Sequence, residues 1–129
     1  EIDSPGGIII ACPPERILPQ LVGTPVEWKG TTNLYFYSNR GLQENRLINL
    51  VSDPTSLINT FSVLDEVAPT YKMKQQGGSL ISVTLRDMMP REGIIGQAEQ
   101  DLLRHRRLPN DSLTFLATYD VAQAQPIIT

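Results

Sequence analysis

The sequence predicts an α+β fold, a two-layer sandwich in which two or three helices pack on one face of a mixed or antiparallel sheet. Short runs of alternating apolar residues indicate strands, two longer segments show helical spacing, and ten prolines and nine glycines divide the chain into short elements. A length of 129 residues fits one domain with its own core. We expect that domain over residues 1–121, followed by a loose tail over residues 122–129, where the composition is Gln-Ala-Gln-Pro.

The first part of the chain is expected to hold several strands. Residues 7–12 indicate a short buried strand, and Pro14 is placed in the first turn of a short helix. Residues 26–29 and 34–37 both alternate apolar and polar side chains around a loop that contains Gly and Asn. These two runs predict a β-hairpin. Residues 42–51 suit either a further strand or one face of a helix.

Two helices are predicted in the second part of the chain. Asp53 and Pro54 are typical of a helix start, because Asp accepts hydrogen bonds from first-turn amides and Pro tolerates the first helical position. The apolar residues of this first helix are Leu57, Ile58, Phe61 and Leu64. A second helix begins at Pro90, and its buried stripe is Ile94, Ile95, Ala98 and Leu102.

Two more strands complete the predicted sheet. Residues 80–86 alternate regularly, with Ile81, Val83 and Leu85 on one face. Residues 113–119 follow a turn and form the last strand. Within the second helix, Gly93 and Gly96 each cost about 1 kcal/mol relative to Ala. We therefore expect another backbone to approach the helix there, either in the sheet layer or across a dimer interface.

The composition excludes several classes of protein. A net charge of −3 is too small to steer a strongly charged partner, and a single Cys excludes an internal disulfide. With only one His as well, the chain lacks the ligands of a Cys/His zinc site, and we predict no metal and no cofactor. The longest apolar run, residues 8–12, is far shorter than the ~20 residues of a membrane helix. No signal peptide is recognised, and the start at Glu1 predicts a processed or trimmed product.

The sequence contains no clear pattern of catalytic residues. The only His, His105, is expected to be a surface residue at a helix end, and no Gly-x-Ser-x-Gly segment accompanies it. Cys12 is expected to be a small core residue, and residues 77–79 indicate a turn because no helix start follows them. Glu99 and Asp101 are two residues apart on a helix and do not face each other. The sequence therefore predicts that the chain is not an enzyme.

The basic cluster is the most suggestive feature, and it consists of Arg104, His105, Arg106 and Arg107. Arginine forks match phosphate geometry, which indicates an RNA contact, whereas cations at a helix C-terminus also stabilise its free carbonyls. Asp101 is placed to pair with Arg104 or His105. We favour a helix cap or a contact with a partner protein over a nucleic-acid contact. Tyr35, Phe36 and Tyr37 offer a stacking ring, although core and interface packing explain them as well.

Three segments carry a resemblance to a known family: Gly6 to Ile10, the helix from Pro90 to Arg107, and the tail over residues 122–129. They resemble the trimmed core of a minor inner-capsid protein of the cystoviruses, the double-stranded RNA bacteriophages. The resemblance implies a non-enzymatic accessory protein of the virion core that aids capsid assembly, RNA packaging or polymerase function. Its implied partners are other capsid proteins, the polymerase and single-stranded RNA. The resemblance assigns no functional residue, because no family motif matches a position of this chain.

Two classes of function remain at this point. The first is an accessory protein that forms a homodimer and acts through its surface, with residues 104–107 as the RNA-binding or partner-binding site. Its location is then the virion core and the host cytoplasm. The second is a small cytoplasmic enzyme of unknown reaction that uses carboxylates or Arg on an unfamiliar fold. We expect no membrane contact in either case.

Overall fold

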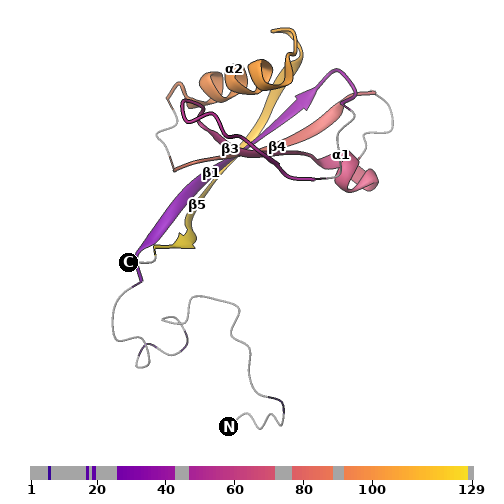
Figure 1. Ribbon diagram of the computed structural model, residues 1–129. Coiled ribbons are helices and arrows are strands. Elements are labelled where there is room, and N and C mark those ends of the chain that lie inside the picture. The colour runs from indigo at the N-terminus through magenta and orange to yellow at the C-terminus, as the bar shows by residue number, and fades with distance from the viewer. Residues whose placement is uncertain are drawn as a thin grey trace.

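In the computed structural model, the described part of the chain is a mixed α+β structure dominated by an antiparallel sheet (Figure 1). The described residues are 6, 17, 19, 26–42, 47–71, 77–88 and 92–127. Within them the sheet has five strands in the order β2-β3-β4-β1-β5, and every neighbouring pair is antiparallel. The strands are β1 (Trp28–Ser38), β2 (Asn49–Leu50), β3 (Ile58–Val63), β4 (Ser79–Leu85) and β5 (Leu113–Pro126). The helices are α1 (Leu64–Val67), a 3-10 turn at Pro69–Tyr71, and α2 (Ile94–Arg106).

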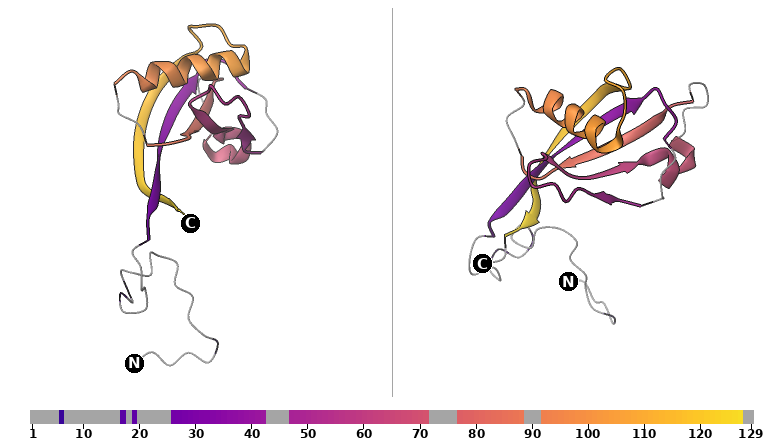
Figure 2. Two further views of the ribbon diagram at one scale, coloured as in Figure 1. Left: turned by 60° about the vertical axis from the view of Figure 1, so that its left-hand side comes forward. Right: turned by 45° about the horizontal axis from the view of Figure 1, so that its top comes forward.

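The core lies between α2 and the sheet face that α2 crosses, which we call the inner face (Figure 2). From α2 it receives Ile94, Ala98, Leu102 and Leu103. From the strands it receives Leu34, Phe36, Ile58, Phe61, Val63, Ile81, Val83, Leu85 and Leu113. The alternation predicted for residues 80–86 is confirmed in β4, and the predicted stripe of the second helix is confirmed, with Ile95 only partly buried. The opposite, outer face of the part of the sheet formed by β1 and β5 carries no described helix.

The hairpin predicted from residues 26–37 is wrong, because this segment is the single long strand β1. Gly30, near the start of this strand, lies in a tightly packed position and not in a turn. A Cβ on Gly30 would lie 3.1 Å from Met88 Cβ and 3.2 Å from the Val121 carbonyl oxygen. The next residues continue the strand, and Thr32 is buried and donates its hydroxyl to Asp120 Oδ1 at 2.8 Å.

The helix predicted to begin at Asp53 is also wrong, because the segment forms β3 and only the four-residue α1 follows it. A register shift between Ile58 and Thr60 inserts one extra residue into β3 opposite β4. The shift brings Ile58 and Phe61, three residues apart, to the same buried face and so imitates helical spacing. Asp53 does accept a backbone hydrogen bond, from Thr55 N at 2.9 Å, but in a tight turn.

The tail predicted to be loose needs correction over residues 122–126, which are the last part of β5. Here Gln125 pairs with Lys29 and Pro126 with Trp28, and Ile127 N donates to the Glu27 carbonyl oxygen at 2.8 Å. The first half of β1 supplies these backbone partners whatever the side chains of β5 are. The amino-acid composition of residues 122–126 therefore predicted too short a last strand.

The two helical glycines have different roles from the one predicted. Gly93 precedes α2 with a φ of 77°, a left-handed conformation that suits glycine, and a Cβ on Gly96 would meet nothing within 4 Å. No described neighbour lies within 4 Å of a Cβ built at either position, so the expected approach of another backbone in the sheet layer is wrong for the described residues. An approach across a dimer interface stays a prediction. The predictions made for residues 7–12, Pro14 and Pro90 lie outside the described residues. No helix among the described residues has the length and apolar character needed to cross a membrane.

Candidate partner-binding surfaces

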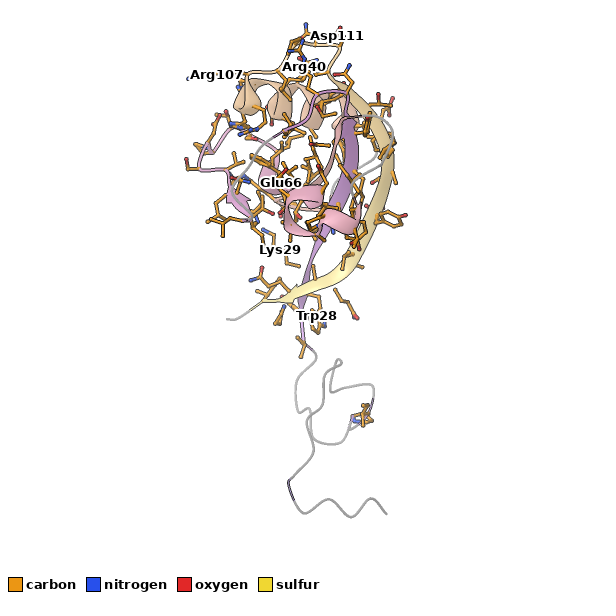
Figure 3. All side chains as sticks on the ribbon, turned by 90° about the vertical axis from the view of Figure 1, so that its right-hand side faces the viewer. Trp28, Lys29, Arg40, Glu66, Arg107 and Asp111 are labelled. Atoms are coloured by element: carbon orange, nitrogen blue, oxygen red, sulfur yellow. The ribbon has the colours of Figure 1, made fainter. Side chains whose placement is uncertain are left out.

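The arginine cluster predicted from the sequence lies at the C-terminal end of α2, as expected. Arg107 follows the last helical residue with a φ of 52°, and Leu108 N donates to the Leu103 carbonyl oxygen at 2.9 Å. The cations of the last turn complement the negative end of the helix dipole. Arg107 is exposed, and Figure 3 shows it at the outer end of α2, at the opposite end of the molecule from Trp28 and Lys29.

Arg104 is held by two carboxylates. Its Nη2 donates to Asp101 Oδ1 at 2.9 Å and to Asp53 Oδ2 at 3.2 Å, which confirms the predicted pair with Asp101. Only this one nitrogen is used: Nε and Nη1 make no hydrogen bond to any described residue. The guanidinium is therefore fixed in orientation while two of its donor nitrogens stay available.

The two carboxylates are themselves fixed by the loop before β3. Asp101 Oδ2 accepts from Ser56 Oγ at 2.9 Å and from Leu57 N at 2.8 Å. Asp53 Oδ1 accepts from the hydroxyl of Thr55 at 2.7 Å and from its backbone N–H. These hydrogen bonds from Thr55 hold the pKa of Asp53 below its usual value, and the charges of Arg104 and His105 act in the same direction.

The other two residues of the predicted site, Arg106 and His105, lie in different surroundings from Arg104 and Arg107. The guanidinium of Arg106 sits over the Phe61 ring, 5.8 Å from its centroid, and burial lowers the pKa of Arg106. His105 is at the helix end as predicted but is partly buried, and its Nε2 has no hydrogen-bond partner among the described residues. The cluster is therefore not one continuous basic surface.

A cavity of about 570 Å³, which we call the α2-end pocket, opens beside this helix end. Its lining includes Leu50, Ser52, Asp53, Phe61, Arg104 and His105. The structure thus brings two of the four predicted site residues, Arg104 and His105, to one pocket. Both Asp53 oxygens already accept hydrogen bonds, so this carboxylate holds Thr55 and Arg104 in position. Among the described residues, no three His, Cys, Asp or Glu side chains are grouped as metal ligands.

A second surface lies on the outer face of the sheet and is formed by β1, β4 and β5. We call it the tyrosine patch, and it consists of Tyr35, Leu80, Leu116, Ala117 and Tyr119 around a hollow of about 460 Å³. The rings of Tyr35 and Tyr119 meet edge to face, with centroids 5.7 Å apart. Leu116 is 47% exposed and Tyr119 is 60% exposed.

Part of the tyrosine patch has a signal in the sequence. Tyr35 alternates with Leu34 and Phe36, which are fully buried, so the period of two alone places Tyr35 on the other face. Leu116 has no such signal. A register shift opposite Tyr35 and Phe36 adds one residue to β5 there, and Leu116 joins the patch because of it.

No family model, curated protein or solved structure matches the chain.

Proposed function

We propose that the chain is a non-enzymatic accessory protein that acts through protein contacts, built as a two-layer α+β sandwich that forms a homodimer. The observation that carries this proposal is the exposed tyrosine patch beside β5, a strand at the edge of the sheet. The tyrosine patch and the edge strand β5 each support the proposal separately.

The patch differs from the rest of the outer face. The outward residues of β3 and β4 are mainly small and polar, as expected of a face in contact with water: Thr60, Ser62, Ser82 and Thr84. At β1 and β5 the same face carries Tyr35, Leu116 and Tyr119 instead. Tyrosine buries a large apolar area and keeps a polar end, and it is enriched in protein interfaces.

The edge strand supplies the geometry for a second copy. β5 pairs with β1 on one side, and no described strand lies on its other side. Among its fourteen residues only Asp120 is charged, and that carboxylate accepts a hydrogen bond from Thr32. Long edges with few charges readily pair with another strand. A two-fold axis that pairs β5 with its copy makes one continuous sheet and brings the two patches onto the same face.

The location and the further partners that we propose come from the resemblance to the inner-capsid proteins of cystoviruses. We propose the virion core and host cytoplasm as the location, with other capsid proteins or the polymerase as further partners. A protein partner is favoured over RNA because RNA needs a continuous basic surface, whereas here Arg104 is paired with two carboxylates and Arg106 lies over Phe61.

Sedimentation velocity over a range of concentrations tests this function. The wild type is expected to dimerise, and Leu116→Lys is expected to remain monomeric because it places a charge in the patch. Leu50→Lys is the matched control, since Leu50 is also an exposed leucine but lies on β2 at the other edge of the sheet. A monomeric wild type, or equal loss of the dimer in both variants, would contradict the proposal.

The same runs with a labelled single-stranded RNA separate the two classes of partner. We expect no RNA to sediment with the protein at moderate salt. RNA that is carried at low salt and released as salt rises would instead indicate phosphate contacts.

A further inference from the structure

At β2, the other edge of the sheet, no described strand pairs with the outward side of the backbone. Val51 N donates to the Asn59 carbonyl oxygen at 2.9 Å, and Asn49 is aligned with Phe61 across the β2–β3 ladder. In an antiparallel ladder successive residues turn their N–H and C=O groups to opposite sides. The backbone N–H and C=O of Leu50 therefore face away from β3, towards the open edge.

The side chains along this edge are unusually apolar for an exposed segment. Leu47, Ile48 and Leu50 are 64%, 69% and 80% exposed, the three highest values among the exposed large hydrophobic residues described. Three such residues within four positions make this edge segment accessible and apolar, and exposed apolar surface of this kind marks interaction sites. We call this segment the β2 edge.

The α2-end pocket borders the β2 edge, since Leu50 lines it together with Arg104 and His105. Arg104, held by its two carboxylates, keeps Nε and Nη1 unused among the described residues. Arg107 is exposed beyond it and forms no ion pair within the described ranges. Arg107 therefore adds an exposed positive charge beside the Arg104 guanidinium on a chain of net charge −3.

We propose that the β2 edge and the α2-end pocket together bind an extended segment of another protein that carries aliphatic side chains and a carboxylate. The segment adds as a strand to the backbone of Leu50, its aliphatic side chains cover Leu47 and Ile48, and its carboxylate reaches the unused donors of Arg104. Because Asp53 and Asp101 already fix Arg104, binding loses little side-chain entropy there. The inference rests on the proposal that the chain acts through protein contacts, but it uses the edge opposite β5.

Amide chemical-shift titration of the full chain with synthetic peptides tests the inference. The probe is a short peptide of alternating Val and Glu, and a peptide with Lys in place of Glu is its matched control. We expect saturable shifts over residues 47–53 and 104–107 with the Val–Glu peptide, and none with the Val–Lys peptide. Arg104→Gln is expected to weaken binding about tenfold. Leu50→Lys is expected to weaken it as well, and Leu116→Lys to leave it unchanged.

Three results would overturn the inference: no saturable shift up to millimolar peptide, equal shifts with both peptides, or shifts confined to β5. Single-stranded RNA is the third probe, and shifts at residues 104–107 with RNA but with neither peptide would assign the cluster to nucleic acid. The outcome is separate from that of the dimer. A monomeric wild type that still binds the Val–Glu peptide would remove the homodimer and leave this site in place.

Discussion

Replacing Asp101 by Ala is expected to destabilise the protein by about 3 kcal/mol, because this one carboxylate joins α2 to the loop before β3. Its side chain is only 17% exposed and accepts three hydrogen bonds, from Ser56 Oγ, Leu57 N and Arg104 Nη2. The Leu57 N–H and the buried Ser56 hydroxyl would lose their acceptor, at roughly 1–2 kcal/mol each. The ion pair with the exposed Arg104 adds about 0.5 kcal/mol or less.

Equilibrium unfolding in urea measures this change. Asp101→Ala is expected to lower the midpoint with an unchanged slope, and to lower Tm by roughly 10 °C. Asp101→Asn keeps one acceptor oxygen and should fall between the two proteins. Glu99→Ala is the matched control: Glu99 is also an acidic residue of α2 but makes no hydrogen bond or ion pair to a described residue. A loss below about 1 kcal/mol in Asp101→Ala, or a loss equal to that of Glu99→Ala, would refute the reasoning.

Three further predictions concern other parts of the fold. Leu102→Ala removes a fully buried side chain between α2 and the sheet, and chemical unfolding should show a loss of about 2–5 kcal/mol; a loss under 1 kcal/mol would mean that α2 is not packed there. Gly96→Ala should raise the free energy of unfolding by about 0.5–1 kcal/mol, because a Cβ there meets nothing within 4 Å. Gly93→Ala should lower it by about 1 kcal/mol, because φ is 77° at that position, and the opposite order of the two Tm values would contradict this account. The pKa of Asp53 is lowered in the folded protein, so its stabilising effect is present above the unfolded pKa of about 4 and is lost as pH falls through the folded pKa. Tm measured from neutral pH to about pH 2 should therefore fall less steeply in Asp53→Asn than in the wild type, and identical profiles would exclude the effect.

Regular hydrophobic periodicity was sufficient to predict an element where a single face of that element packs against the core. In β4 each second side chain is buried, and in α2 the buried positions follow the helical repeat, so both are visible in the sequence. The α+β class follows from these two elements. Pairing of Asp101 with Arg104 was also predictable, because three residues along a helix bring two side chains together.

Bulges and long-range pairing were not visible in the same way. The extra residue of β3 between Ile58 and Thr60 gave a strand the spacing of a helix, and Gly30 resembled a turn although it makes room for Met88 and β5. In both places a neighbouring strand decides the backbone conformation. No pattern within a short window contains that information.

The candidate site shows the same limit. Arg104, Arg106 and Arg107 are close in sequence, but their surroundings differ. Arg104 is exposed and paired with two carboxylates, Arg106 is partly buried over the Phe61 ring of β3, and Arg107 is exposed without an ion pair to a described residue. A count of charges along the chain includes none of these partners. Likewise, the tyrosine patch depends on which strands are neighbours, since Leu80 and Tyr119 meet Tyr35 from either side of β1.

Amide hydrogen exchange along β5, measured below and above the concentration at which the protein associates, tests the central proposal most directly. Every second amide between residues 117 and 121 faces away from β1, on the side where no described strand lies. The homodimer proposed here predicts that these alternate amides become protected at the higher concentration, while the outward amide of Leu50 at the other edge does not. Unchanged exchange along β5, or protection at the β2 edge alone, would contradict it.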